Sequence, residues 1–315
     1  MGEIKRATES KKVWTTLITN TKYLSGLLTL DYTLKKVGSK YPLVALYTDA
    51  FPEAGHAALA ARGIPAQRVE YLLPKASKDY SEDPRFYDCW TKLTPFSLVE
   101  YDRVVQLDSD MLVRLNMDEL MDMELDGPEL AGKGKKIFAA GHACVCNPLK
   151  RAHYPADWIP ENCAFTYQHS TPDRAQTEGI DPSVGPLGFM NGGLQVVNPC
   201  KAVYDQILAH LNSDAVVDMD FADQSLLSQL YVGRWVALPY IYNALKTLRW
   251  QGVHSEIWRD DKVKNVHYIL APKPWEEMDA EGKNTSSDPT HVWWVDANNE
   301  RLAMEKEKGI PKDGF

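Results

Sequence analysis

Hydrophobic residues along this chain alternate between short runs and longer stretches with helical spacing. The β-branched and apolar runs at 13–20, 42–48 and 68–73 each predict a strand. Residues 23–36 and 54–62 carry apolar side chains at helical spacing, and a glycine follows each stretch as a C-terminal cap. Strands and helices that alternate through short connections predict an α/β fold with a mixed, mainly parallel sheet and flanking helices.

The later part of the chain continues this pattern less regularly. It predicts strands at 104–113, directly after Gly193, at 234–238 and at 263–269. It predicts helices at 88–101 with a bend at Pro95, at 116–126, at 201–212, from Asp220 onward and at 301–315. Between 141 and 187 neither period appears, and six prolines interrupt the segment. An irregular segment of this length is typical of a lid or a binding loop, and its aromatic residues favour an ordered one.

The apolar run at 104–113 contains two carboxylates, Asp108 and Asp110. Ionised groups at the end of a buried strand are costly unless a positive charge accompanies them. A divalent cation between the two carboxylates and a diphosphate would remove that cost, and oxygen ligation with open positions suits Mg²⁺ or Mn²⁺. The alternative is that the two residues only begin a turn.

Composition and charge limit the classes of function. A net charge of −8 argues against nucleic acid as the main partner, because phosphate binding requires a basic surface. No apolar run is long enough to cross a bilayer, and residues 1–12 are polar and lack the apolar core of a secretory signal. A phosphate-bearing substrate would therefore need a metal ion or local positive charge.

The cysteines of the chain allow two interpretations. They are Cys89, Cys144, Cys146, Cys163 and Cys200. An odd number without repeated spacing is typical of reduced thiols in a cytoplasmic protein. Cys144, Cys146 and Cys163, with His142 and His153 near them in sequence, would supply ligands for zinc, although this spacing is not a standard one.

Several polar residues stand close to predicted strand or helix ends, where ligands of α/β sheets collect. Lys92 is either solvated or bound to an anion, and Asn191-Gly192-Gly193 permits either a close approach to a ligand or a plain hairpin. Asp220 and Asp223 lie at the start of a predicted helix, where capping alone would also explain them. His267, near a strand end, is either a third metal ligand or a packed histidine.

These motifs follow one another in a specific order. The order is Leu-x-Thr-Asn-x-x-Tyr at 17–23, Thr-Lys-Leu at 91–93, Leu-Asp-x-Asp at 107–110, Asn-Gly-Gly at 191–193, Asp-x-x-Asp-Gln at 220–224 and Val-His-Tyr at 266–268 leading to Lys-Pro-Trp at 273–275. This order resembles the family 8 glycosyltransferases over residues 14–275. The resemblance implies a single nucleotide-sugar-binding domain, Rossmann-like and of GT-A type, that uses Mn²⁺ and a UDP-sugar and transfers the sugar with retention of configuration.

The resemblance also implies roles for individual residues and for the parts of the chain. Uracil and ribose would contact Leu17, Thr19, Asn20, Tyr23 and Ser109, the metal would bind Asp108, Asp110 and His267, the diphosphate would meet Lys273, and the donor sugar would lie among Lys92, Asn191, Gly192, Asp220, Asp223 and Gln224. Residues 1–12 would be a disordered leader, 13–279 the catalytic domain with the 141–187 insert near the acceptor side, and 280–315 a C-terminal extension.

Within the family, the chain resembles galactinol synthase and glycogenin. Glycogenin glucosylates its own tyrosine downstream of a Tyr-Asn pair like Tyr242-Asn243, but the corresponding position here is Trp250. The resemblance to galactinol synthase therefore implies transfer of a hexose from UDP-galactose or UDP-glucose to a small polyol such as myo-inositol. A self-glucosylating primer and a non-catalytic nucleotide-sugar-binding protein are the alternatives. The oligomeric state stays open, with a homodimer among the alternatives.

Overall fold

The computed structural model describes residues 5–76, 78–81, 84–184, 187–312 and 314. The strands are β1 (Lys12–Ile18), β2 (Leu43–Tyr47), β3 (Ala66–Arg68), β4 (Arg103–Leu107), β5 (Met111–Val113), β6 (Phe138–His142), β7 (Met190–Val197), β8 (Val236–Ala237), β9 (Ala244–Leu245) and β10 (Asn265–His267). The α-helices are α1 (Leu24–Lys36), α2 (Glu53–Ala61), α3 (Arg85–Cys89), α4 (Ala164–Tyr167), α5 (Lys201–Leu211), α6 (Ala222–Leu230) and α7 (Pro289–Glu307).

Short 3-10 helices connect these elements. They are η1 (Thr21–Tyr23), η2 (Trp90–Ser97), η3 (Asp118–Asp122), η4 (Pro128–Leu130), η5 (Pro160–Asn162), η6 (Gln168–Ser170), η7 (Pro172–Arg174), η8 (Asp214–Val216), η9 (Tyr240–Tyr242), η10 (Lys246–Arg249) and η11 (Pro274–Glu276). No helix in the described ranges combines the length and apolar character that a membrane span requires.

The larger sheet is mixed and mainly parallel, as the sequence predicts. In the described part of the chain its strand order is β3-β2-β1-β4-β7-β6-β8. β1 pairs in parallel with both β2 and β4, whereas β7 runs antiparallel to its neighbours β4 and β6. The order reverses at β1, so the carboxyl ends of β1 and β4 flank the crevice where doubly wound sheets bind ligands.

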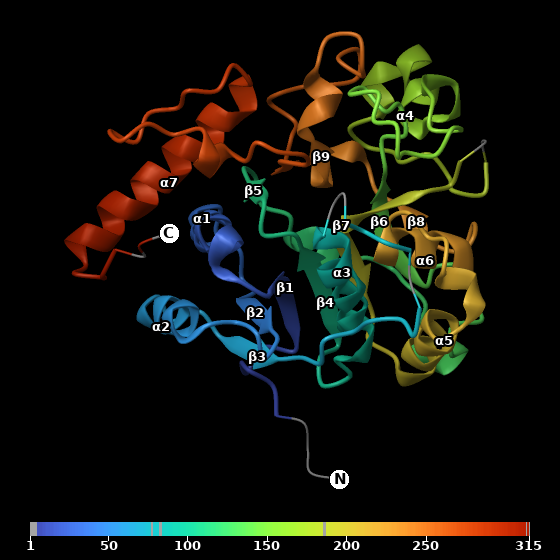
Figure 1. The fold of residues 1–315 in the computed structure, drawn as a ribbon, viewed down its shortest axis with the longest axis horizontal. Helices are drawn as coiled ribbons and strands as arrows, with labels where there is room; N and C mark the ends of the chain where they lie inside the picture. Colours follow the sequence, from blue (N-terminus) through green and yellow to red (C-terminus); the bar gives the residue numbers. More distant parts are fainter. Residues whose placement is uncertain (1–4, 77, 82–83, 185–186, 313, 315) are drawn as a thin grey trace.

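Two helices from opposite ends of the chain pack together on one side of this sheet (Figure 1). Leu27 and Leu28 of α1 are buried in the same apolar cluster as Trp14 of β1. The other side of α1 meets α7, where the hydroxyl of Thr29 donates a 3.1 Å hydrogen bond to Asn298. The helix of the C-terminal extension therefore packs against the sheet-covering helix α1.

The predicted strand at 104–113 is wrong in one respect, because the chain forms two strands there. β4 belongs to the large sheet, and β5 belongs to a smaller sheet with the order β5-β10-β9. Asp108, Ser109 and Asp110 form the turn between them. Carboxylates inside a sheet have no cationic partners, whereas in the turn after β4 they reach side chains that neutralise them.

Other predicted elements also need correction. The predicted strand at 68–73 is wrong in its position, because β3 ends at Arg68. The predicted helix at 88–101 consists of α3 and η2, and Pro95 lies inside the 3-10 helix, where the loss of its N–H is tolerated more easily. The acidic segment at 116–126 contains only η3, and β6, which the sequence analysis missed, lies beside β7 in the large sheet.

The expected leader is only partly described, since residues 1–4 lie outside the described ranges. Of the rest, Arg6 donates to the carbonyl oxygen of Glu100, and the backbone N–H of Ala7 donates to the hydroxyl of Tyr101. The 141–187 insert contains α4 and three 3-10 helices among its described residues. It lies next to the segment that follows β9 (Figure 1).

Candidate active site

The turn after β4 and the end of β10 bring together the three residues predicted to bind metal. β10 pairs antiparallel with β5, and His267 is opposite Met111 in that pairing. The Nε2 atom of His267 consequently lies 3.3 Å from Oδ1 of Asp110 and 3.6 Å from Oδ2 of Asp108. The structure thus joins residues that are more than 150 positions apart in the sequence into one cluster.

The orientation of the His267 ring is fixed by two asparagines. Its Nδ1 atom lies 2.9 Å from Oδ1 of Asn243, and Nδ2 of Asn243 donates to Oδ1 of Asn191 at 2.9 Å. Because the Asn243 oxygen can only accept, Nδ1 of His267 carries a proton, and Nε2 faces the carboxylates. No local sequence signal points to Asn243 as part of this site, because only the fold places it behind the histidine.

Two lysines pair with the two carboxylates. Lys273, which is buried, donates to Oδ2 of Asp110 at 2.5 Å and to the carbonyl oxygen of Tyr268 at 2.6 Å. Lys92, at the start of η2, donates to Oδ2 of Asp108 at 2.7 Å. The interpretation of Lys92 as a solvated surface lysine is therefore wrong.

These contacts control protonation inside the site. Burial by itself raises the pKa of Asp110, but the charges of Lys273 and His267 outweigh it and hold that pKa well below its usual range. Burial by itself lowers the pKa of Lys92, but the charges around it, chiefly Asp108, hold that pKa well above its usual range. The site therefore contains an ionised carboxylate and charged lysines, which suits the binding of a metal and a diphosphate.

The donor atoms of Asp108, Asp110 and His267 lie within 4.8 Å of one another, close enough to bind a single ion. Two carboxylate oxygens and one imidazole nitrogen leave positions open for phosphate oxygens. Mg²⁺ prefers oxygen ligands, so the imidazole favours Mn²⁺ of the two candidates. The residues present fit the predicted metal.

A second carboxylate, Asp223, lies buried near this cluster. Nε2 of Gln195 donates to its Oδ2 at 3.3 Å. Burial raises the pKa of Asp223 to about 7, with Lys92 opposing and the charge of Asp108 adding to the shift. A raised pKa of a buried carboxyl group is common in catalytic sites, where the side chain is kept away from water.

The contacts at the start of α6 test whether Asp220 and Asp223 serve only as caps of this helix. α6 begins at Ala222, and its N-cap residue, Phe221, makes no side-chain cap, so Asp220 does not cap the helix. Asp220 instead forms an ion pair with Lys78. Gln224 accepts a 2.8 Å hydrogen bond from the backbone N–H of Gly192, which ties the start of α6 to β7.

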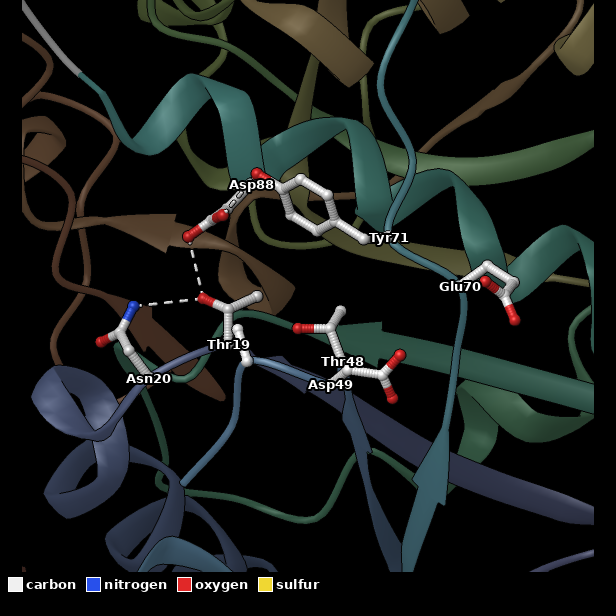
Figure 2. A pocket seen from close by; sticks show the side chains of 8 residues that line it. Thr19, Asn20, Thr48, Asp49, Glu70, Tyr71 and Asp88 are labelled. Carbon is white, nitrogen blue, oxygen red and sulfur yellow. Dashed lines mark hydrogen bonds between the residues drawn. The ribbon is translucent and has the colours of Figure 1, made fainter. Parts of the chain in front are cut away.

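A cavity of about 490 Å³ opens at the carboxyl ends of β1, β2 and β3 (Figure 2). It is lined by Thr19, Asn20, Thr48, Asp49, Ala50, Glu70, Tyr71 and Asp88. Asp88 of α3 accepts hydrogen bonds from the hydroxyls of Thr19 at 2.8 Å and Tyr71 at 2.9 Å. The volume lies in the range of small-molecule sites, and two of the residues predicted to contact the nucleoside line it.

Ser109 joins the acidic turn to the end of β1. Its hydroxyl lies 2.9 Å from that of Thr16 and donates to the carbonyl oxygen of Leu17 at 3.3 Å, so the acidic turn is fixed to the end of β1. The ring of Tyr23 packs edge-on against Trp275 at 5.6 Å, and its hydroxyl accepts from Arg85 at 3.4 Å.

Gly193 leaves room for the imidazole ring of His267 because it has no side chain. A Cβ atom there would lie 2.3 Å from Cε1 of the imidazole. We expect Gly193→Ala to destabilise the protein by about 1–3 kcal/mol, because the ring is fixed by its hydrogen bond and overpacking is costly. Denaturant unfolding measures the effect. The matched control is Gly127→Ala, where the nearest atoms belong to the exposed side chain of Glu129 and can move, so equal losses in both variants would contradict the prediction.

The mixed sheet with the Asp-Ser-Asp turn at its carboxyl edge has the GT-A fold, which solved glycosyltransferase structures share. The chain belongs to glycosyl transferase family 8, whose family model matches residues 15–279. Both the fold and the family expected from the sequence are thereby confirmed.

Curated relatives match over nearly the whole chain. Galactinol synthase 1 of Ajuga reptans is 27% identical over 314 residues, which cover 98% of this chain and 87% of the relative. Galactinol synthase 2 of Solanum lycopersicum is 28% identical over 305 residues, covering 94% and 82%.

Two solved structures show the same fold. The galactosyltransferase LgtC, crystallised with donor and acceptor sugar analogues, aligns with a TM-score of 0.56 at 17% identity, over 95% of this chain and all of LgtC. The bifunctional glycosyltransferase WbbM aligns with a TM-score of 0.61 at 16% identity, over 97% of this chain. This chain spans about half of WbbM, 52% of its length.

Proposed function

We propose that this protein is a retaining transferase that moves a hexose, galactose or glucose, from a UDP-sugar to a small polyol such as myo-inositol. The observation that carries the proposal is the hydrogen bond from Ser109 to the end of β1, which joins the turn of Asp108 and Asp110 to the strand that leads to Thr19 and Asn20 in the cavity. This arrangement has room for a nucleoside on one side and for a metal-bound diphosphate on the other. The relatives named galactinol synthase support the polyol acceptor.

The donor would lie across the carboxyl edge of the sheet. Leu17, Thr19, Asn20, Tyr23 and Ser109 would surround uracil and ribose. Asp108, Asp110 and His267 would hold Mn²⁺, which when bound neutralises the negative charge that develops on the leaving diphosphate. The sugar would lie beside Asn191, Gly192, Asp223 and Gln224.

The lysines would supply positive charge at fixed positions. Lys273 is buried with its ammonium on Asp110, so binding of a diphosphate nearby requires little rearrangement. Lys92 pairs with Asp108, and the charges of Asp108 and Asp223 both act on it. From that position Lys92 can stabilise negative charge on the departing phosphate.

Asp223 and Gln224 are the candidates for stabilising positive charge on the sugar. Retention requires either a nucleophile on the opposite face or attack from the face of the leaving group, and hydrolases offer an analogy for the first route. Asp223 is shielded from water, which strengthens its interaction with a cationic transition state. Asp220, which pairs with Lys78, would bind a sugar hydroxyl only after leaving that partner.

Trp250 argues for a separate acceptor. It occupies the position where the resemblance to glycogenin would require the acceptor tyrosine. Its indole N–H donates to Asp288 at 3.1 Å, and Asp288 is the N-cap of α7. The residue therefore anchors the C-terminal helix.

The free thiols of the cysteines fit a reducing compartment, and we propose the cytoplasm as the place of action.

A donor and acceptor screen tests the proposed function. The purified protein would be incubated with Mn²⁺ and either UDP-galactose or UDP-glucose, with and without myo-inositol, and UDP release would be followed. We expect myo-inositol to accelerate UDP release at least about 10-fold with one of the donors, because the acceptor completes the transfer. Mass spectrometry of the small molecules should show a hexosyl-inositol.

Each other result of the screen points to a different protein. Hexose attached to the protein itself, with no small product, would identify a self-glucosylating primer. Metal-dependent UDP binding without turnover on any polyol would identify a non-catalytic nucleotide-sugar-binding protein. Calorimetric titration with UDP and Mn²⁺ beside the turnover assay separates these two results.

A further inference from the structure

A second group of potential metal ligands lies outside the candidate active site. Cys144 and Cys146 follow β6, Cys163 precedes α4, and His254 lies in the turns after η10. Their ligand atoms all lie within 4.8 Å of one another. Nε2 of His254 is 3.1 Å from Sγ of Cys146 and 3.3 Å from Sγ of Cys163. All the cysteines are free thiols.

We propose that Cys144, Cys146, Cys163 and His254 bind one structural Zn²⁺ ion. Three thiolates and one imidazole form a common ligand set for structural zinc. Zn–S bonds of about 2.3 Å in a tetrahedron place sulfur atoms about 3.8 Å apart, and the observed cluster needs only small side-chain rotations to reach that geometry. Because the protein supplies four ligands, no position stays open for water or substrate, so the ion has a structural role.

The surroundings of His254 match those of a zinc-binding histidine. Its Nδ1 atom lies 2.9 Å from Nε2 of His169, which belongs to the 141–187 insert as the three cysteines do. Ligating histidines usually donate their second N–H to a neighbouring acceptor, and the contact with His169 holds the ring of His254 in place. In the zinc-bound form His254 would donate from Nδ1 to His169 and bind the ion through Nε2. His254 and Cys163 are fully buried, so the ligands are protected from bulk water.

The two histidines that the sequence offered as zinc ligands, His142 and His153, make other contacts. Nε2 of His142 donates to the carbonyl oxygen of Ile180 at 2.7 Å, and His153 packs against Tyr154. The fourth ligand comes from His254, 91 positions after Cys163. No standard spacing reveals this residue, because the fold alone brings it to the insert.

The proposed ion would fasten the insert to the body of the enzyme. The helices of the insert are single turns, so regular hydrogen bonding stabilises it little. The site links both ends of residues 144–163 to the segment after β9. Within this loop Trp158 stacks on Phe221 with ring centroids 4.4 Å apart, and Phe221 is the N-cap residue of α6. Zinc would thus also fix the segment that packs against the start of the helix carrying Asp223.

Metal analysis of the full chain tests the proposal. We expect the wild-type protein, purified without chelators, to contain close to one zinc per chain by plasma mass spectrometry. Cys163→Ser should lose nearly all of it, since three remaining ligands bind far more weakly. Cys200→Ser, which removes a buried thiol outside the cluster, should retain it. His169→Ala should weaken zinc binding about 10- to 100-fold through loss of the contact to His254.

Cobalt binding keeps the test valid should Cys163→Ser fail to fold. Reduced wild-type protein, freed of metal by a chelator and titrated with Co²⁺, should show thiolate-to-cobalt absorption and tetrahedral d–d bands that Zn²⁺ abolishes. Co²⁺ at the Asp108, Asp110 and His267 cluster has no sulfur ligand and gives no such thiolate band. Wild-type protein with neither zinc nor this band, or with two of the three thiols joined in a disulfide, would overturn the proposal.

The zinc test is independent of the proposed function. Asp110→Asn, which removes a ligand of the other cluster, should keep its zinc and its thiolate-to-cobalt absorption. Failure of the polyol assay with an intact zinc site would refute the function alone. Active protein without zinc would refute the zinc site alone.

Discussion

Asp110→Asn is expected to lower the Mn²⁺-dependent affinity for UDP by about 100-fold or more, equivalent to about 3 kcal/mol. The carboxylate of Asp110 contacts both His267 and Lys273, at 3.3 and 2.5 Å. The substitution removes a charged metal ligand and leaves the buried ammonium of Lys273 without its anion. Calorimetric titration with UDP in Mn²⁺ and in chelator measures the loss.

The control separates loss of the metal site from loss of the fold. Asp122→Asn removes an exposed carboxylate that pairs with Lys12, and should bind UDP as the wild type does. In chelator, the Asp110 variant and the wild type should show the same residual UDP affinity, because the cavity at Thr19 and Asn20 is unchanged. Wild-type affinity of the Asp110 variant in Mn²⁺ would refute the metal-ligand assignment.

Asp223→Asn is expected to reduce kcat by about 1000-fold with less than about a 5-fold change in the KM for the UDP-sugar. The carboxylate is buried near Lys92 and the metal cluster, where its charge can act on a cationic transition state. An amide of the same shape keeps the packing but loses that charge. Steady-state kinetics with saturating acceptor measures both constants. The control is Asp205→Asn, which removes an exposed carboxylate on α5 and should leave both unchanged.

The pH dependence of stability shows whether the Asp223 variant is folded and whether its carboxyl is perturbed. Burial raises the folded-state pKa to about 7 from an ordinary value of 3.8. The wild type therefore loses stability as pH rises through this range, by up to about 4 kcal/mol in metal-free protein. Asp223→Asn lacks this loss, so the variant should gain on the wild type between about pH 4 and about pH 8 in denaturant unfolding. A constant difference across this range would contradict the buried-carboxyl interpretation.

Local sequence was sufficient to predict most elements of the large sheet. β1, α1, β2 and α2 lie within a few residues of their predicted bounds, because each has a strong hydrophobic period and an identifiable end. β6 was missed because its run, Phe-Ala-Ala-Gly-His, has small residues in place of β-branched ones. In the described insert, the short helices were missed because single turns leave no detectable period.

The candidate site could be predicted as a set of residues but not as a geometry. Asp108 and Asp110 were evident because paired carboxylates after an apolar run conflict with burial. Asp88, which accepts a hydrogen bond from Thr19, gave no signal, since an acidic residue on a short helix is usually solvated. Asn243 was also not predicted as part of the site, because its role depends on the neighbouring positions of β7 and β10.

The sequence by itself determined the α/β pattern, the acidic turn and the family resemblance, because these depend on local periodicity and on motifs in a fixed order. Tertiary structure alone decided which distant side chains meet. It placed His267 against the acidic turn, Lys273 on Asp110, and His254 among three cysteines of the insert. Such contacts depend on strand pairing and loop packing between residues 90 or more positions apart, and local sequence does not encode those distances.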